Sequence, residues 1–177
     1  MPVNATRFLR KMRGGAQAHL LGTDAPGPSP CFVTKFINNP QHRRILINEW
    51  LGAHLLASLG IASAKAAVVA LAPEFLAATP DIYLESGAAR QPVPPGWHLG
   101  SQFPGDPLTD AVYDYLPDSL LSSVVNLPDF LGVLAFDKWC SNADARQAIF
   151  LRRRLRDWLP GHLAPPAAKG FIAQMID

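Results

Sequence analysis

The segment over residues 31–61 constrains the fold more than any other part of the chain; it reads CFVTKFINNPQHRRILINEWLGAHLLASLGI. Its alternating apolar residues predict a strand over 32–37. The Asn-Asn-Pro that follows predicts the start of a helix, with Asn39 at the N-cap and Pro40 in the first turn, where no backbone N–H is needed. Gly60 suits the left-handed position just past a helix end. A strand, a tight turn and a long helix are therefore expected.

Two opposite charges interrupt the apolar pattern of this segment. Lys35 lies within the strand, and Glu49 lies on the helix face that small and apolar residues otherwise form. The other residues on that face are Ile45, Gly52, Ala53 and Leu56. An unpaired carboxylate there would be costly or would take up a proton, and an ion pair removes that cost. We therefore predict that Lys35 and Glu49 pair, either as a structural ion pair or as part of a site.

Composition and charge limit the classes of function. The 177 residues are 49% hydrophobic and 17% charged, enough for a core in one domain or in two small lobes that share a cleft. The net charge of +2 is too small to indicate nucleic-acid binding. The basic run over 152–156 is interpreted as a solvated strand or turn edge. Cys31 and Cys140 predict buried free thiols, and no signal peptide or membrane-length apolar run occurs, so we expect a soluble, cytoplasmic protein without a membrane partner.

The rest of the chain reads as short strands, a second helix and proline-rich loops. Gly14-Gly15 separates two strand-like stretches, as an ordinary hairpin turn or as a place where the backbone approaches a ligand. Asn126 and Pro128 predict the start of the second helix, which runs to Cys140. Strands are expected at 66–71, at the start of 111–117, at 148–152 and at 171–176. An apolar stretch lies around 82–84, and a long loop is expected over 90–107.

Several polar and aromatic residues are interpreted as structural. Asp137 is expected to be a surface or capping charge, and His42 and His54 are expected on the helix surface. Trp97 and His98 are expected to pack within the long loop. None of these residues has histidine or cysteine neighbours at metal-ligand spacing.

The order of these parts is the most informative feature of the sequence. A glycine turn, a strand lysine, a helix glutamate, an extended connector, a helix, an Asp-containing loop and a hairpin ending in Asp follow one another, as in the protein-kinase-like fold. In phosphoryl transfer, the glycine turn and the lysine bind phosphates, and the glutamate holds the lysine. One aspartate accepts the hydrogen bond of the acceptor hydroxyl, and another holds Mg²⁺. The fold class expected is therefore α+β and protein-kinase-like.

The chain also resembles the HipA-like kinases, in the uncharacterised kinase-domain branch, along RGGAQAHLL, FVTKFINNPQHRRILINEWLGAHLLASLGI, HLGSQFPGDP, VYDYLPD, FLGVLAFDKWCSNADARQAIF and AQMID. That family comprises bacterial serine/threonine kinases, best known from the toxin of a toxin–antitoxin pair. The resemblance implies a nucleotide-binding lobe with a small antiparallel sheet over 1–117, and the beginning of a helical C-terminal lobe over 118–177. It also implies ATP and Mg²⁺ as cofactors, and a protein substrate or an antitoxin-like partner.

The resemblance assigns roles to individual residues. Lys35 would bind the ATP phosphates, and Glu49 would hold it. Asp144 would be the catalytic aspartate of a loop that Asn142 shapes, and Asp177 would bind the metal. Nucleotide binding would also involve Gly14, Gly15 and Gln17 of the glycine turn, and Tyr113, Asp114, Tyr115 and Leu116 of the connector beside the adenine.

Two departures from the family pattern bear on activity. No asparagine follows Asp144 in its loop, so Gln147 is the only amide available there as a metal ligand. The chain also ends at Asp177, where a kinase continues into further helices. Apolar surface left uncovered would make the isolated chain poorly soluble or dependent on a partner. Three functions stay open. They are an ATP-dependent phosphotransferase acting on a hydroxyl, a pseudokinase that binds nucleotide or a partner, and a structural domain in which Lys35 and Glu49 only form an ion pair.

Overall fold

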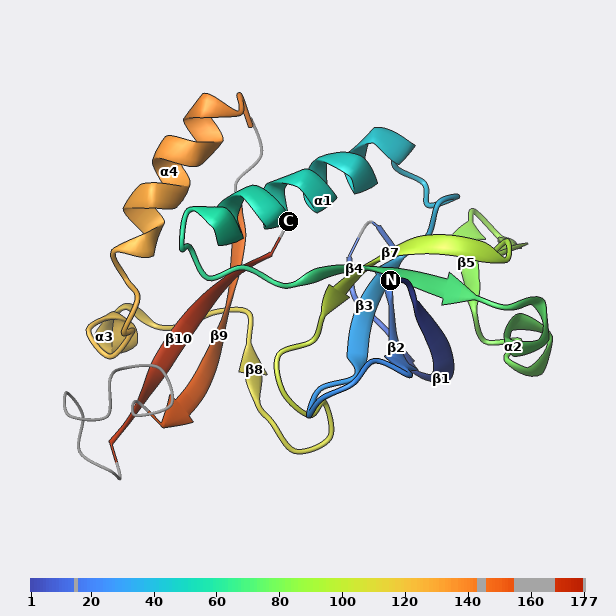
Figure 1. Cartoon of the computed structure of the whole chain (residues 1–177), viewed down its shortest axis with the longest axis horizontal. Coiled ribbons are helices and arrows are strands. Elements are labelled where there is room, and N and C mark those ends of the chain that lie inside the picture. Colours follow the sequence, from blue (N-terminus) through green and yellow to red (C-terminus); the bar gives the residue numbers. More distant parts are fainter. Residues whose placement is uncertain (15, 143–145, 155–167, 177) are drawn as a thin grey trace. The chain divides into compact units, whose positions relative to one another are not determined.

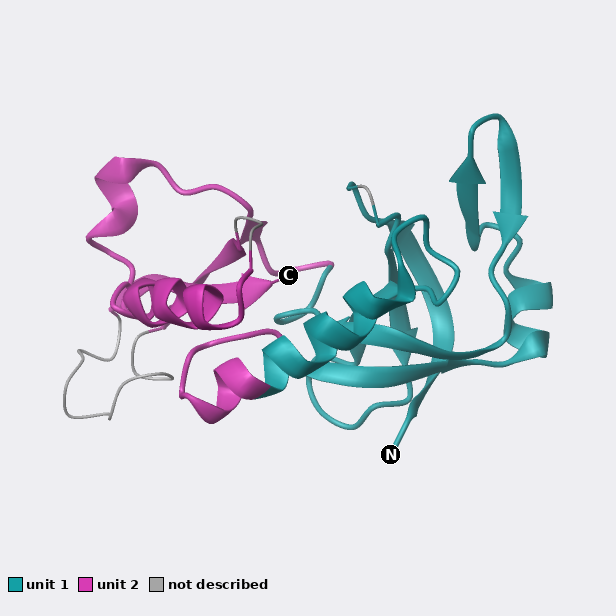
Figure 2. Ribbon diagram, turned by 90° about the horizontal axis from the view of Figure 1, so that it is seen from above, with its two compact units in different colours: residues 1–54, 65–107 teal, residues 55–64, 108–177 magenta. Residues whose placement is uncertain are grey.

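The computed structural model describes two compact units, coloured separately in Figure 2. Unit 1 comprises residues 1–54 and 65–107, and unit 2 comprises residues 55–64 and 108–177. The residues that the structure describes are 1–14, 16–142, 146–154 and 168–176. Among them, no helix is both long enough and apolar enough to cross a membrane.

Unit 1 is built around a closed five-stranded barrel (Figure 1). The strands are β1 (Val3–Lys11), β2 (His19–Thr23), β3 (Cys31–Lys35), β4 (Ala66–Leu71) and β7 (Gly96–Gln102). Their order around the barrel is β1-β2-β3-β7-β4, and β4 then meets β1. Neighbours are antiparallel except β1 and β4, which run parallel where Val3 pairs with Val69 and Asn4 with Ala70. Each strand therefore has a partner on both sides, which removes free edges from this sheet.

The barrel is filled by apolar side chains from alternate positions of its strands. Leu21, Phe36 and Val69 are fully buried at its centre. Gly100 on β7 is required there, because a Cβ at this position would collide with Val69 and come within 3.2 Å of Phe32. Helix α2 (Pro73–Ala78) and the hairpin of β5 (Tyr83–Ser86) and β6 (Ala89–Pro92) follow β4 in the chain.

Helix α1 (Arg43–Ser58) begins three residues later than the sequence indicated. The reason is that Asn39 stabilises a separate turn: its Nδ2 donates to Phe36 O at 2.7 Å, and its Oδ1 accepts from Gln41 N at 2.8 Å. His42 then accepts the N–H of Arg44 through Nδ1 at 3.1 Å, so it serves the helix start. The predicted helix end is confirmed, since Gly60 has φ +75°.

Unit 2 combines a three-stranded antiparallel sheet with two helices. The strands, in spatial order, are β10 (Lys169–Ile176), β9 (Gln147–Arg154) and β8 (Val112–Tyr113), and the helices are α3 (Asp118–Leu121) and α4 (Asp129–Trp139). Asn126 connects the helical segment to the sheet, because its side chain bonds both the N–H and the C=O of Ala173 at 2.8 Å. The core of this unit contains Phe136 of α4 and Met175 of β10.

The predicted protein-kinase-like fold with a helical C-terminal lobe is wrong. The chain forms small sheets, one of them a closed barrel, and helices make up only 23% of the described residues. The expectation was based on the order of local elements. Order along the chain does not determine whether a sheet closes, because closure depends on contacts such as Val3 with Val69 that local patterns do not contain.

Many of the individual elements are nevertheless confirmed, including the strand at 66–71, the helix after Pro128 and the final hairpin. Two local expectations are wrong. Strand β7 lies within 90–107, which was read as a loop, and it places His98 in the core while Trp97 is exposed. Cys140 is exposed rather than buried, because it follows α4 at its C-terminal end; Cys31 is buried as expected.

Candidate functional site

The predicted ion pair between Lys35 and Glu49 is confirmed. Lys35 is the last residue of β3, and its Nζ donates to Glu49 Oε1 of α1 at 2.8 Å. The two side chains are only 13% and 14% exposed. Both charges lie in unit 1, at the point where the chain passes from a barrel strand to its long helix. The remaining question is whether the pair is purely structural or also positions Lys35 for a ligand.

The structure shows why Glu49 tolerates its position. The helix face predicted from the sequence is the inner face, since Ile45, Gly52 and Ala53 are half-buried and Leu56 is buried. A carboxylate on that face loses water, and a nearby ammonium compensates for this loss. Such a pair also holds the long lysine side chain in one position. A fixed, charged ammonium is a suitable ligand for a phosphate group.

The glycine turn joins β1 to β2, and it is anchored on one side. Gly14 has φ +126°, which favours glycine, and Gln17 has φ +50°. The side chain of Gln17 bonds both backbone groups of Glu85 on β5: Nε2 donates to its O at 2.9 Å, and Oε1 accepts from its N at 2.6 Å. The carboxamide of Gln17 therefore holds the turn against β5. Gly15 lies outside the described residues.

Lys11 strengthens the same anchorage at the end of β1. Its Nζ lies 3.3 Å from Glu85 Oε1 and 3.2 Å from the centre of the Tyr83 ring. Figure 1 shows that the β1–β2 turn lies at the end of the barrel where α1 is found. Gly14, Gln17, Lys35 and Glu49 thus all belong to unit 1, where Lys35 and Glu49 are joined by their ion pair.

The predicted adenine connector lies in unit 2, and its four residues differ in how far their side chains are exposed. Tyr113 is 41% exposed, and its ring packs edge-on against Phe171 at 5.9 Å. Asp114 and Tyr115 are exposed. Leu116 is buried in the core of the unit, so its side chain has a structural role and only its backbone could contact a ligand.

The two predicted catalytic and metal-binding aspartates, Asp144 and Asp177, lie outside the described residues. Gln147, the other predicted metal ligand, is the first residue of β9 and is exposed. It pairs with Ile176, the residue before Asp177. In the part of the chain that the structure describes, no group of three or more His, Cys, Asp or Glu residues could hold a metal ion. A Mg²⁺ site therefore stays a prediction.

The ion pair between Asp137 and Arg146 was not predicted from the sequence. Arg146 donates to Asp137 Oδ1 from both Nε and Nη2, and the side chains of Arg146 and Asp137 are 11% and 15% exposed. Asn142 also bonds Asp137, through its N–H and its Nδ2. Asp137 is therefore a partly buried anchor rather than a surface charge. Asp137 and Arg146 are nine residues apart and gave no periodic signal, since a helix end and a loop separate them.

The sequence also did not indicate that two buried histidines of the barrel, His19 and His98, pack against the same aromatic ring. The ring of Phe36 lies between them, with its centre 4.9 Å from that of His19 and 5.4 Å from that of His98. Burial lowers the pKa of His98 to about 4 and also lowers the pKa of His19. The Nε2 atom of His19 has no hydrogen-bond partner among the described residues. Both rings are thus neutral parts of the core near neutral pH.

No family model matches the chain, and neither a curated protein nor a solved structure does so. These comparisons therefore do not identify a HipA-like kinase, and that resemblance stays a prediction.

Proposed function

We propose that the chain binds ATP with Mg²⁺ and transfers the γ-phosphate to a hydroxyl group, on a protein substrate or an antitoxin-like partner. The observation that supports this proposal is the 2.8 Å ion pair between Lys35 and Glu49. A strand lysine held by a helix glutamate is the arrangement that positions a lysine for ATP phosphates in phosphoryl transfer. The rest of the assignment comes from the sequence.

In this proposal Lys35 binds the α- and β-phosphates, and Glu49 keeps it charged and in place. The β1–β2 turn adds backbone N–H groups near Gly14, where the absence of a side chain allows close approach. Gln17 has an indirect role, because its carboxamide is bonded to Glu85 and so holds the turn. Asp144 positions the acceptor hydroxyl, and Asp177 with Gln147 holds Mg²⁺.

A second candidate is nucleotide binding without transfer. It is favoured by Gln147, which stands where the family has a metal-binding asparagine and which lies in strand β9 rather than in a loop. A strand backbone restricts where the side chain can point, so a metal there would depend more heavily on Asp177. Both candidates share the same nucleotide site at Lys35.

The nucleotide site can be tested with a variant that is expected to fold. Lys35→Met alone leaves Glu49 unpaired, so the variant to compare is Lys35→Met/Glu49→Leu, which removes both charges. Replacing a buried pair by apolar residues of similar size is often neutral for stability. The matched control is Lys65→Met, because Lys65 is an exposed lysine of the same unit.

The melting temperature of each chain is measured with and without Mg-ATP. Phosphate transfer from labelled ATP is then measured, both to the chain itself and to serine and threonine peptides. At about a hundred times its dissociation constant, ATP should stabilise the wild type and the control by about 2.7 kcal/mol. Loss of this effect in the double variant, together with transfer by the wild type, supports the phosphotransferase. Binding without transfer supports the second candidate. No binding in the wild type leaves Lys35 and Glu49 as a structural pair and overturns both.

We also place the protein in the cytoplasm. The support is that Cys31 and Cys140 are free cysteines, as expected in a reducing compartment. Fractionation of cells that express the tagged chain tests this placement.

A further inference from the structure

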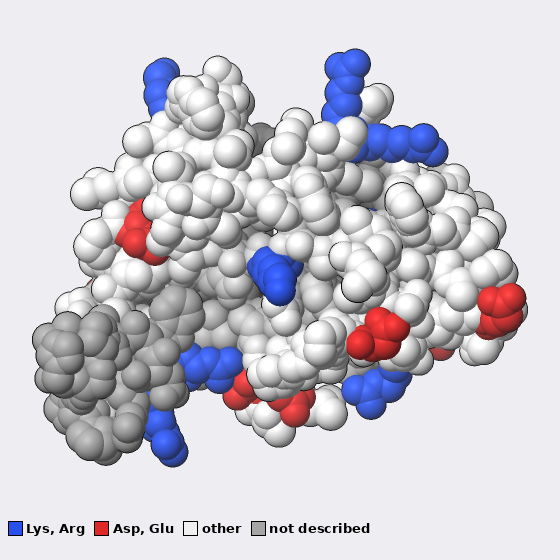
Figure 3. All heavy atoms as spheres, viewed as in Figure 1, with Lys and Arg blue, Asp and Glu red and all other residues white. Residues whose placement is uncertain are grey.

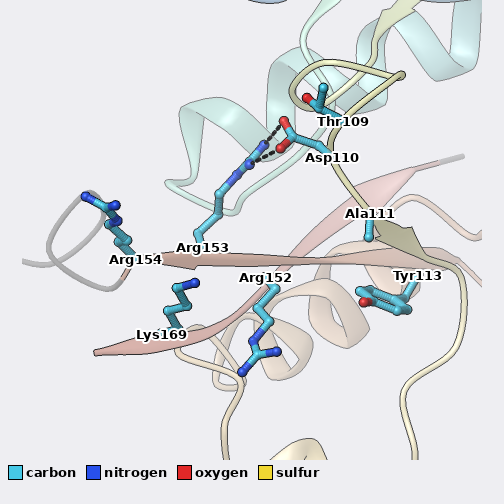
Figure 4. A pocket seen from close by; sticks show the side chains of 8 residues that line it. All are labelled: Thr109, Asp110, Ala111, Tyr113, Arg152, Arg153, Arg154 and Lys169. Carbon is cyan, nitrogen blue, oxygen red and sulfur yellow. Dashed lines mark hydrogen bonds and ion pairs between the residues drawn. The ribbon is translucent and has the colours of Figure 1, made fainter. Parts of the chain in front are cut away.

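Unit 2 contains a basic pocket of about 430 Å³ at one end of its sheet (Figure 4). Its charged and aromatic lining residues are Asp110, Tyr113, Arg152, Arg153, Arg154 and Lys169. They come from β8 and the segment before it, from the end of β9 and from the start of β10. The size lies within the range of small-molecule sites. None of the roles proposed for Lys35, Asp144 or Asp177 involves this pocket.

The pocket concentrates positive charge in a chain that has little of it. Four basic residues and one acidic residue line it, a net charge of +3, whereas the whole chain has a net charge of +2. The face in Figure 3 shows basic and acidic side chains widely spaced over a mainly uncharged surface. Charge of one sign gathered in a concave site raises the local concentration of ligands of the opposite sign.

Arg153 is already held in place by an ion pair. Arg153 forms a two-pronged ion pair with Asp110, with Nη1–Oδ1 and Nη2–Oδ2 distances of 3.2 Å. Figure 4 shows Arg153 reaching toward Asp110, while Arg152 points to the other side of β9. Arg153 is thereby neutralised and held at the pocket wall. The cations that remain for a ligand are Arg152, Arg154 and Lys169.

Two of these three cations are placed unfavourably with respect to each other, because Lys169 lies directly opposite Arg154 in the β9–β10 ladder. Arg152 lies two residues from Arg154 along β9 and points to the other side of the strand (Figure 4). Like charges at opposite positions of a sheet are destabilising. Within the described residues, none of the three forms an ion pair. A bound anion would relieve this repulsion and satisfy guanidinium groups whose planar N–H donors match phosphate oxygens.

We propose that this basic pocket binds a small, multiply charged phosphate compound, with its phosphate groups bound by Arg152, Arg154 and Lys169. Tyr113 adds a flat surface on the side of β9 where Arg152 lies, because its ladder partner Phe150 lies two residues before Arg152. Its exposed ring can pack against the uncharged part of such a ligand. The proposal does not rest on Lys35, although Tyr113 is also one of the connector residues predicted to lie beside the adenine.

The test uses the full chain and inorganic tripolyphosphate as the probe in titration calorimetry. The variant is Arg152→Gln/Lys169→Gln, which removes two of the three cations, one of them the cation opposite Arg154, and should fold. The matched control is Arg10→Gln/Arg44→Gln, because these arginines are exposed in unit 1. We expect saturable binding by the wild type and the control, weakened at least tenfold in the variant and also weakened by added salt.

Three results would overturn the proposal. They are no saturable binding by the wild type, equal affinities of the wild type and the variant, or an equal loss of affinity in the variant and the control. A third chain, Lys35→Met/Glu49→Leu, separates the two sites. It should retain tripolyphosphate binding, and loss of binding in this chain alone would place the probe at Lys35 instead. Single-stranded DNA of increasing length is the last comparison. Affinity that rises with length and exceeds that for tripolyphosphate would indicate a nucleic-acid surface and overturn the small-ligand assignment.

Discussion

Arg146 donates two hydrogen bonds, from Nε and Nη2, to one carboxylate oxygen of Asp137, at 2.9 and 2.8 Å. Asn142 bonds the same residue, with its N–H 2.8 Å from Asp137 O and its Nδ2 3.3 Å from Asp137 Oδ1. The residues on both sides of segment 143–145 are therefore tied to the last turn of α4. Asp137 therefore holds both Asn142 and Arg146 in place.

We expect Asp137→Leu to lower the free energy of unfolding by about 2 to 3 kcal/mol, because it leaves Arg146 as a partly buried charge without this partner. Asp137→Leu/Arg146→Leu should recover part of this loss, since neither charge then remains. Chemical denaturation of the wild type, both single variants and the double variant gives the coupling energy. A coupling energy of zero would mean that the pair does not stabilise the fold.

The same comparison applies to Lys35 and Glu49, which are buried to a similar degree. Each side chain is less than 15% exposed, so either single variant, Lys35→Met or Glu49→Leu, should destabilise the chain by about 3 kcal/mol. The double variant should be within about 1 kcal/mol of the wild type. Urea unfolding measures this, and additive losses in the two single variants would show that the charges do not interact.

Burial, together with the hydrogen bond from the N–H of Ile37, explains why the neutral form of His98 is preferred. Its Nδ1 accepts the N–H of Ile37 at 3.2 Å, and its Nε2 lies 3.1 Å from the carbonyl oxygen of Pro94, to which it donates. Both ring nitrogens are therefore used by the neutral ring. A second proton would have to be added at Nδ1, facing the N–H of Ile37, in a site that burial has removed from water. Burial is the main cause of the lowered pKa.

This geometry predicts a loss of stability in acid. The pKa of His98 is about 4 in the folded chain, below its ordinary value of 6.5, so the unfolded chain binds the proton more readily. The contribution of neutral His98 to the free energy of unfolding is complete above pH 6.5 and is lost as the pH falls from 6.5 toward 4. At pH 5 the loss should be about 2 kcal/mol, and burial of His19 acts in the same direction.

Melting curves between pH 7.5 and pH 5 measure this effect in the wild type and in His98→Gln. The glutamine can keep a hydrogen bond and does not titrate, so its stability should depend less steeply on pH. The matched control is His54→Gln, because His54 is exposed on α1. Equal pH slopes for the wild type and His98→Gln would show that His98 is not responsible.

The outer side of α4 exposes large apolar residues. Leu131 and Leu134 are 72% and 68% exposed, and Trp139 is exposed near the helix end. Apolar surface of this kind favours association. We expect Leu131→Gln/Leu134→Gln to increase the monomer fraction in sedimentation experiments while changing the free energy of unfolding by less than about 1 kcal/mol. Val133→Ala, at a buried position of the same helix, should instead cost about 2 kcal/mol. A wild type that is already fully monomeric at high concentration would contradict the first expectation.

The sequence predicted those parts of the fold that depend on neighbouring residues. An apolar run located the strand at 66–71, and Gly60 marked the end of α1 because its φ of +75° suits glycine. The charges of Lys35 and Glu49 could be paired because each was out of place in its own apolar pattern. These signals are all local, and each has a direct physical cause.

The remaining features depend on contacts that local patterns do not contain. Closure of the barrel requires Val3 to meet Val69, and the start of α1 was displaced by side-chain bonds of Asn39 and His42. Strand β7 was missed because prolines and glycines surround it, although it pairs with both β3 and β4. Asp137 looked like an ordinary helix charge until the position of Arg146 was known.

The meeting of β1 with β4 also has a consequence for how the chain folds. The hairpins β1–β2 and β2–β3 join residues that are close in sequence, whereas Val3 and Val69 are separated by most of unit 1. Contacts between distant residues form late, because the intervening chain must lose its freedom first. We therefore expect amide hydrogens of Val69 and Ala70 to gain protection after those of β2 during refolding. During that interval β1 and β4 are unpaired edges, and this is the period in which the nascent chain is most exposed to aggregation.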